Sequence, residues 1–277
     1  MIKEIANAKI NLSLNVIGKR TDGFHNLESI MLPLDFYDEL VFEESEEDVV
    51  LGCSIADNII IKAIKLFKEH FNIQDKYVKI TLDKKIFIAA GLAGGSADAA
   101  ATLKGLNRLW HVNASQKDLL KLSEHLGSDV PFTLLNKVSI ARGRGELLTP
   151  IYSNLECYCL LINPRFKVST PDVFKEFKIV DSSTNDNLKK ITEGLINNDL
   201  ELINNYIFND LEAATFRLYP DLKRIKQEIE TKTKLKIMMS GSGPTLFILN
   251  KNSKLLENIA NVFNKSYDVI IKKVKNN

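Results

Sequence analysis

The sequence predicts a mixed α/β protein of two domains, and three observations lead to this prediction. A chain of 277 residues is long enough for two domains of ordinary size. The composition, 45% hydrophobic and 26% charged, is that of a globular protein that can bury a core. Segments that alternate polar and apolar residues, as strands do, are interspersed along the chain with segments of helical periodicity.

Charge and cysteine usage narrow the class of protein. The formal net charge is only +2, so no global basic field of the kind that indicates nucleic-acid binding is present. The three cysteines form no C-x-x-C pair and no disulfide framework, which fits a reducing compartment. The N-terminus has no apolar signal segment, and no stretch approaches the length of a membrane span. We expect a cytoplasmic protein that binds neither nucleic acid nor membrane.

The first predicted element is a strand over residues 9–16. Apolar residues at even positions alternate there with polar residues at odd positions, which predicts a half-buried strand. Lys9 and Asn11 then project from the same face of the strand. The simplest interpretation of these two residues is a polar face in contact with water. The apolar segment 30–42 predicts a further strand, broken at Pro33.

A turn-rich loop over residues 18–27 carries Phe24 and His25. Loops of this kind hold functional residues more often than cores do. Phe24 could stack on a planar ligand while His25 hydrogen-bonds to its edge, or the two could simply anchor the loop.

Next, Asp57 or Ser54 can cap a helix that runs from about residue 58 to 71. Residues 78–82 alternate as a strand and lead through Lys84 and Lys85 into a glycine-rich stretch. Lysines directly before a glycine-rich stretch suit the binding of a nucleotide. The alternative is that they are ordinary surface lysines, which are abundant in proteins.

The glycine-rich stretch covers residues 88–101 and is the most informative part of the chain. Gly91, Gly94 and Gly95 permit tight turns and close approach of a ligand, and Ser96 and Asp98 stand where a helix to about residue 110 would begin. Backbone N–H groups and the helix dipole favour phosphate at such a place. The stretch is neither a G-x-x-x-x-G-K-[ST] nor a G-x-G-x-x-G motif. A glycine-rich turn before an ordinary buried helix is the alternative.

Residues 127–132 (GSDVPF) follow a second helix, predicted over residues 119–126 with a capping box at 115–118. Asp129 lies just past that helix, and a proline two residues later fixes its position. A carboxylate held beside apolar residues suits a general base, and an Asx-type turn residue is the alternative. Residues 139–149 contain the segment 142–146 (RGRGE), which reads as a loop with two cations, Arg142 and Arg144.

The second half predicts a buried strand over residues 157–163 and a polar linker at 181–187. Residues 237–249 read as strand, turn and strand, in which Gly241 and Ser242 make either a hairpin turn or a second close approach to a ligand. The remaining predicted elements are helices at 171–177, 188–197, 199–208, 221–231 and 255–263 and a strand at 268–274.

Taken together, five motifs resemble those of the GHMP kinase superfamily over essentially the whole chain. They are residues 8–12 (AKINL), 19–27 (KRTDGFHNL), 91–96 (GLAGGS), 127–132 (GSDVPF) and 241–245 (GSGPT). The DGFH segment resembles the corresponding motif of those superfamily members whose substrate carries a cytidine diphosphate.

The resemblance implies a fold, two domains and a reaction. The fold would be α+β, with an N-terminal domain like domain 2 of ribosomal protein S5 over residues 1–151 and a C-terminal ferredoxin-like domain over residues 152–277. The reaction would be transfer of the ATP γ-phosphate to the 2-hydroxyl of a cytidine diphosphate sugar alcohol, in the non-mevalonate route to isoprenoid and terpenoid precursors.

The resemblance also implies roles for individual residues. Asp129 would be the catalytic base and Lys9 would keep it ionised and stabilise the transferring charge. Substrate-binding positions would be Asn11, Phe24, His25, Thr170, Phe174, Gly241 and Ser242, with the two phenylalanines on either side of the cytosine. ATP-binding positions would be Asn58, Lys84, Gly91, Leu92, Ala93, Gly94, Gly95 and Ser96.

Magnesium is expected with ATP, and Ser96 is the one residue we name as a possible ligand to it. The chain departs from the superfamily's usual glycine loop at Phe87, Ala93 and Ala97, which leaves Lys9 and Asp129 untouched. Two alternatives remain: a kinase of the mevalonate or homoserine type, and a nucleotide-binding module without catalysis.

Overall fold

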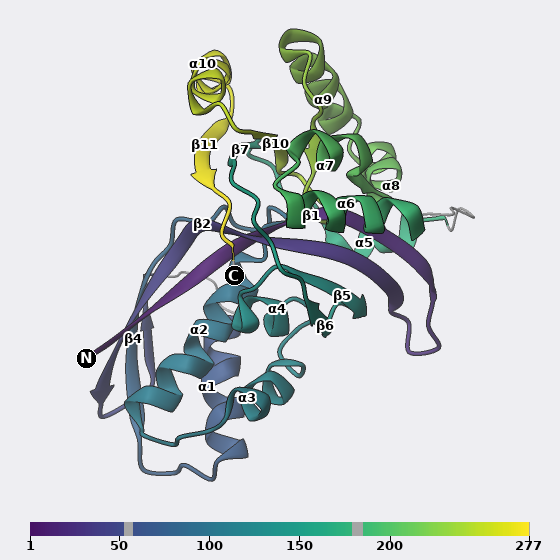
Figure 1. Ribbon diagram of the computed structural model, residues 1–277. Helices are drawn as coiled ribbons and strands as arrows, with labels where there is room; N and C mark the ends of the chain where they lie inside the picture. Colours follow the sequence, from purple (N-terminus) through teal and green to yellow (C-terminus); the bar gives the residue numbers. More distant parts are fainter. Residues whose placement is uncertain (53–57, 179–184, 277) are drawn as a thin grey trace. The chain divides into compact units, whose positions relative to one another are not determined.

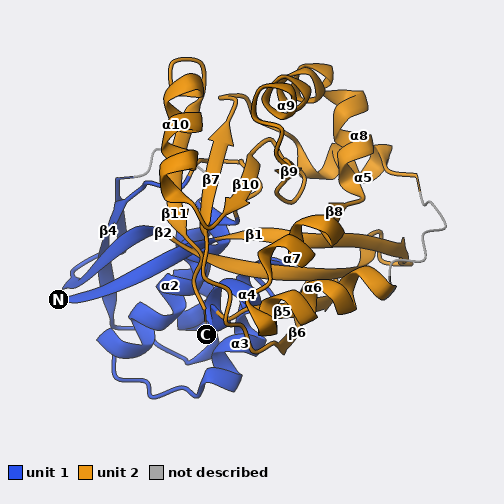
Figure 2. Ribbon diagram, turned by 45° about the horizontal axis from the view of Figure 1, so that its top comes forward, with its two compact units in different colours: residues 1–8, 36–86, 93–136 blue, residues 9–35, 87–92, 137–277 orange. Residues whose placement is uncertain are grey.

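The computed structural model describes residues 1–52, 58–178 and 185–276, and the chain forms two compact units (Figure 2). Unit 1 comprises Met1–Ala8, Phe36–Ile86 and Ala93–Asn136, and unit 2 comprises Lys9–Asp35, Phe87–Leu92 and Lys137–Asn277. The two longest strands, β1 (Ile2–Lys19) and β2 (His25–Ser45), contribute residues to both units. Each unit is made of three separate segments of the chain, so the two units do not correspond to one boundary in the sequence. The predicted domain boundary after residue 151 therefore stays a prediction.

Unit 1 is a small sheet with helices packed on it (Figure 1). The second half of β2 pairs antiparallel with β4 (Tyr77–Asp83), which pairs parallel with β3 (Val49–Leu51). The helices are α1 (Ile59–His70), α2 (Gly94–Leu109), α3 (Gln116–Ser123) and α4 (Val130–Leu135). Helices α1 and α2 pack side by side, and Phe42, Phe67 and Trp110 lie in the core that they cover.

The helix starts in unit 1 test the predicted caps. The predicted capping box of α3 is confirmed, with Ser115 and Asp118 bonded reciprocally. For α1 the cap is Asn58, whose Oδ1 accepts a hydrogen bond from Ile60 N at 2.9 Å. Asp57 and Ser54, which we predicted as caps, lie outside the described residues.

Unit 2 contains the first half of β2, which pairs with β5 (Ser139–Gly143), and β5 pairs with β6 (Leu147–Pro150). The predicted loop at residues 142–146 contains the turn of this hairpin, residues 144–146, although its first two residues belong to β5. The hairpin strands on either side of the turn were not predicted. The predicted break at Pro33 is wrong, because β2 is continuous. Pro33 lies between the residues that pair with β5 and those that pair with β4, so neither of these ladders needs the N–H that proline lacks.

The C-terminal sheet of unit 2 has the order β11-β7-β10-β9, with all pairs antiparallel. Its strands are β7 (Tyr158–Asn163), β9 (Met238–Met239), β10 (Leu246–Asn250) and β11 (Asp268–Lys273). Numbered along the chain this order is fourth, first, third and second, which is the ferredoxin-like arrangement that the resemblance implied. The predicted strand at 157–163 and the strand-turn-strand at 237–249 are confirmed.

Six helices lie among the described residues of this part of unit 2. They are α5 (Thr170–Glu176), α6 (Asn185–Asn197), α7 (Leu200–Tyr206), α8 (Leu211–Leu218), α9 (Pro220–Thr233) and α10 (Ser253–Phe263). Helix α8 was not predicted. Of the predicted linker at 181–187, residues 181–184 lie outside the described residues, and residues 185–187 begin α6 instead. No described helix combines the length and the apolar character needed to cross a membrane.

Strand β1 differs from its prediction in burial. In unit 2 its odd positions are buried as deeply as its even ones: Lys9 is 3% exposed, Asn11 2% and Ser13 0%. The half-buried strand and the solvated polar face are therefore both wrong. Alternation in the sequence marks two faces, but it does not show whether a second layer covers the polar one. Strand β8 (Phe208–Asn209) pairs parallel with β1, and the Asp210 carboxylate accepts from Val16 N at 2.9 Å.

Candidate functional site

In unit 2, β1 fixes two polar side chains that the sequence singled out. The Lys9 ammonium donates to Asn11 Oδ1 at 2.7 Å, and Asn11 Nδ2 donates to Ser29 Oγ on β2 at 2.8 Å. A chain of buried hydrogen bonds therefore holds both side chains in one orientation. Ser29, which completes this chain, carried no motif that could have identified it.

Lys9 also connects β1 to the glycine-rich loop. Its backbone N–H donates to the carbonyl of Leu92 at 3.1 Å. Gly91 lies one residue earlier with φ +76°, and a Cβ on it would come 2.1 Å from the carbonyl oxygen of Ser240. Only glycine fits there, because the conformation is left-handed and the backbone of the second glycine-rich turn occupies the space.

That second turn lies directly against the first within unit 2. Ser240 Oγ donates to the Gly91 carbonyl at 2.9 Å, and Thr245 N donates to the Ala90 carbonyl at 3.3 Å. Gly241 adopts φ +57°, and its carbonyl accepts from Asn209 Nδ2 at 2.8 Å. The structure thus brings together two glycine motifs about 150 residues apart in the sequence.

In unit 1, α2 begins at Gly94, so Ser96 lies within the first turn and is not the N-cap that its type suggested. The N-cap position belongs to Ala93, which has φ +57° and no capping side chain, and the first turn holds no acidic residue. The first N–H groups of the helix are therefore not satisfied by a side-chain cap, which is the condition for anion binding at a helix start. The left-handed backbone at Ala93 explains why a glycine is usual at that position.

Asp129 is held in unit 1 at the start of a short helix. It is the N-cap residue of α4, its carbonyl accepts from Thr133 N at 3.1 Å, and its side chain makes no cap bond. The Thr133 hydroxyl also donates to the carbonyl of Ser96 at 3.0 Å. The loop of Asp129 and the first turn of α2 are thereby tied together inside one unit.

Lys84 lies between two carboxylates of unit 1. Its ammonium is 2.5 Å from Asp38 Oδ2 and 2.5 Å from Asp98 Oδ2. Burial raises the pKa of Asp98 to about 7; the Lys84 cation opposes this and the Asp38 charge adds to it. Neither Asp38 nor its link to Lys84 was predicted, because the two are 46 residues apart: Asp38 belongs to β2, and Lys84 follows the end of β4.

The aromatic residues of the predicted cytosine site lie in unit 2. His25 stacks on Phe174, with ring centroids 5.2 Å apart and planes at 26°, and it meets the edge of Phe177 at 6.4 Å. Burial, and to a smaller extent the Lys19 cation, lowers the pKa of His25 below its usual value. The neutral imidazole, with one donor and one acceptor nitrogen, is therefore favoured at neutral pH.

Phe24 is 48% exposed, and the Arg144 guanidinium lies over its ring at 5.0 Å. Thr170 Oγ1 and Ser242 Oγ share a hydrogen bond of 2.7 Å, which joins the start of α5 to the second glycine-rich turn. The sandwich of cytosine between Phe24 and Phe174 stays a prediction.

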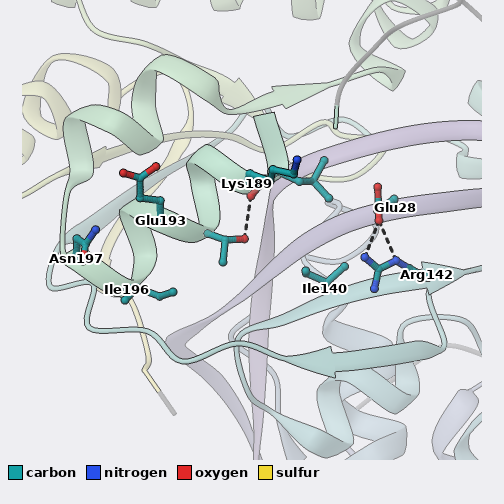
Figure 3. A pocket seen from close by; sticks show the side chains of 9 residues that line it. Glu28, Ile140, Arg142, Lys189, Glu193, Ile196 and Asn197 are labelled. Carbon is teal, nitrogen blue, oxygen red and sulfur yellow. Dashed lines mark hydrogen bonds and ion pairs between the residues drawn. The ribbon is translucent and has the colours of Figure 1, made fainter. Parts of the chain in front are cut away.

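A pocket of about 590 Å³ in unit 2 contains none of the predicted site residues (Figure 3). It is lined by Glu28, Ile140, Arg142, Leu188, Lys189, Thr192, Glu193, Ile196 and Asn197. Its Arg142 is paired with Glu28 at 2.8 Å, as the dashed lines in Figure 3 show. Predicted site and pocket are thus different places in the molecule. Within the described ranges, no group of three or more His, Cys, Asp or Glu residues could hold a metal ion.

Comparisons with known proteins agree with these motifs. The family models "GHMP kinases N terminal domain" and "GHMP kinases C terminal" match residues 58–137 and 191–269. A protein of Lachnoclostridium phytofermentans named 4-diphosphocytidyl-2-C-methyl-D-erythritol kinase is 40% identical, covering 91% of this chain and 89% of its own. The chain belongs to this family of GHMP kinases. A Bacillus mycoides protein of the same name is 41% identical over 92% of the chain and 90% of its own length.

Solved structures support the same fold for this GHMP kinase. A crystal structure of 4-(cytidine 5'-diphospho)-2C-methyl-D-erythritol kinase matches with a TM-score of 0.84, 29% identity and complete coverage of both chains. A homoserine kinase from Cytophaga hutchinsonii matches with a TM-score of 0.76, 21% identity and coverage of 98% and 94%, and it shows the fold alone. The two-domain GHMP kinase fold predicted from the sequence is confirmed, and GHMP kinases use ATP.

Proposed function

We propose that this GHMP kinase transfers the γ-phosphate of ATP to the 2-hydroxyl of 4-diphosphocytidyl-2-C-methyl-D-erythritol, giving the 2-phosphate and ADP, in the non-mevalonate synthesis of isoprenoid precursors. The observation that carries the proposal is 40% identity over about nine-tenths of the chain to kinases named for that substrate. The described side chains support it from both ends of the reaction.

The ATP end is supported by backbone geometry. Helix α2 begins without a side-chain cap, and Gly95 in its first turn is exposed and carries no Cβ. Both features suit a phosphate bound by N–H groups at the start of α2. We assign Gly91, Leu92, Ala93, Gly94, Gly95 and Ser96 to the phosphates of ATP, and Asn58 and Lys84 to further contacts with the adenine nucleotide.

The chemical step is assigned to Asp129 and Lys9. Asp129 accepts the proton of the attacking hydroxyl as the new O–P bond forms and the bond from the γ-phosphorus to ADP breaks. Lys9 stabilises the negative charge of the transferring phosphoryl group, and its bond to Asn11 fixes the direction of its ammonium. Phosphoryl transfer depends mainly on positioning and on neutralised charge, so one carboxylate with a set of cations and N–H donors is sufficient.

The cytidine end is assigned to the aromatic residues of unit 2. A neutral His25, held by Phe174, offers both a donor and an acceptor to the polar edge of a pyrimidine. Phe24 offers an exposed ring face for stacking. Asn11, Thr170, Gly241 and Ser242 complete the assigned substrate positions.

Magnesium accompanies ATP in this proposal. The described residues offer no cluster of carboxylates that would hold the ion by itself, so the phosphates supply most of its ligands and Ser96 is the one assigned residue. The ion neutralises charge on the phosphates when bound. A cytoplasmic location also stays a prediction, to be tested by cell fractionation.

The test is a comparison of substrates with the purified chain, ATP and magnesium. Phosphate transfer to the cytidyl substrate is expected at a kcat/KM at least about a hundredfold above that for mevalonate or homoserine, because a site built to hydrogen-bond a base rejects substrates without one. A preference for mevalonate or homoserine would replace the substrate, and no transfer to any of the three would leave a nucleotide-binding module.

A further inference from the structure

Asp38 and Asp98 are nearly inaccessible carboxylates of unit 1, and both contact the same lysine. The side chains of Asp38 and Asp98 are 0% and 5% exposed, and that of Lys84 is 18% exposed. Lys84 has three N–H donors, and two of them serve these carboxylates. We call this set of three residues the Lys84 brace.

On one side the brace is anchored to the sheet. Asp38 belongs to β2, and its Oδ1 accepts from the backbone N–H groups of Lys85 at 2.6 Å and Ile86 at 2.7 Å. One carboxylate thus binds three donors of the segment that follows β4. This fixes residues 84–86 relative to β2.

On the other side the brace reaches the start of α2. Asp98 is the fifth residue of this helix, and its Oδ2 accepts from Lys84. A Cβ on Gly94, the first residue, would lie 3.2 Å from Lys84 Nζ and 2.8 Å from Ile86 Cγ2. Residues 84–86 therefore pack directly against the first turn of α2.

Stability alone does not account for this arrangement. Two carboxylates share one ammonium in a site that is largely withdrawn from water, so both carboxylates pay a desolvation cost, and burial raises the pKa of Asp98 to about 7. The Asp98 Oδ1 atom is buried without a hydrogen-bond partner among the described residues, which is a further cost. Buried ion pairs are often no more stabilising than apolar residues of similar volume, so a role in orientation is the better explanation.

We propose that Asp38 and Asp98 are positioning residues that act through Lys84 to hold the first turn of α2, and with it the N–H groups that bind the ATP phosphates. The proposal rests on the proposed function for its ligand. Because α2 has no side-chain cap of its own, its first turn depends on such contacts from outside: Lys84 to Asp98, and Thr133 to Ser96. Neither carboxylate needs to touch the nucleotide.

The test compares Asp98→Asn and Asp38→Asn with the control Asp83→Asn. Asp83 pairs with Lys85 at 2.8 Å in the adjacent segment, but both side chains are at least half exposed, at 61% and 50%. We expect each brace variant to bind a non-hydrolysable ATP analogue about tenfold more weakly, and to bind the cytidyl substrate as the wild type does. Amide hydrogen exchange in the ligand-free protein should rise at residues 94–98 in the brace variants. Asp83→Asn should change none of these.

The proposal is overturned if the brace variants match Asp83→Asn, or if exchange rises throughout unit 1 and both ligands bind equally less well. If Asp98→Asn does not fold, Asp98→Glu replaces it, because it keeps the charge and displaces the carboxylate by one methylene; the same pattern is expected with smaller changes. Failure of the proposed function is separate: the wild type would then bind the ATP analogue but not phosphorylate the cytidyl substrate.

Discussion

One substitution, Gly95→Ala, separates the contribution of the glycine loop to the stability of the fold from its contribution to ATP affinity. Gly95 is an exposed residue in the first turn of α2, and its backbone is not in the left-handed region. Among the described residues, a Cβ there would meet only Ile59 Cγ2, at 3.8 Å, which is ordinary van der Waals contact. The fold therefore does not require glycine at this position.

The two expected effects have opposite signs. Replacing glycine by alanine within a helix stabilises the fold by roughly 0.5–1 kcal/mol, because glycine loses more backbone entropy on folding. The new methyl group, however, would stand where the phosphates are proposed to approach the N–H groups. Loss of one charged hydrogen bond costs about 1.5–3 kcal/mol, so the affinity for ATP should fall about 10- to 150-fold.

Urea unfolding and calorimetric titration with an ATP analogue measure the two effects separately. Gly94→Ala gives the contrast, since its Cβ would lie 2.8 Å from Ile86 Cγ2 and should destabilise the fold. Affinity for the cytidyl substrate serves as the internal control. A stabilised Gly95→Ala protein with unchanged ATP affinity would refute the assignment of Gly95 to the phosphates.

Three further predictions concern the carboxylates of Asp98 and Asp129 and the aromatic ring of Phe24. The pKa of Asp98, raised from 3.8 to about 7 by burial, means that the folded state binds the extra proton; its contribution to stability is complete below about pH 4 and is lost as the pH rises through 7. The unfolding free energy should therefore drop by about 2 kcal/mol more between pH 5.5 and 7.5 in the wild type than in Asp98→Asn, and equal drops would contradict this pKa. Asp129→Asn should lower kcat by about 10²- to 10⁴-fold with KM nearly unchanged, and turnover within a few-fold of the wild type would remove the base assignment. Phe24→Ala should weaken binding of the cytidyl substrate by roughly 1–3 kcal/mol while ATP binds as before; an unchanged dissociation constant would argue against stacking.

The sequence predicted the elements well where local chemistry decides them. Ser115 with Asp118 predicted the start of α3, and periodicity predicted α1 and β4. It failed where a distant segment decides. The burial of Lys9 depends on a layer over the polar face of β1, and the hairpin at residues 139–149 depends on pairing with β2.

The same distinction holds for the candidate site. Motifs identified Gly91, Gly241 and His25, and the structure shows the first two in contact and the third stacked on Phe174. Spacing could not show that Asp38 shares Lys84 with Asp98, because these residues come from three separate elements or loops. Resemblance to a family identifies the residues that are typical of that family. The contacts that support those residues become visible only in the three-dimensional structure.

The pairing of β1 with β8 has a consequence for biosynthesis. Val16 N bonds to a carboxylate 194 residues later in the chain. At typical synthesis rates of about 5–20 residues per second, β1 waits roughly 10–40 s on the ribosome before that partner exists. During this time a nascent strand carrying Lys9, Asn11 and Ser13 presents polar groups to water, which makes it a poorer template for premature aggregation than an apolar strand would be. We expect these polar side chains, which are buried in the folded protein, to favour solvation of the strand until β8 is made.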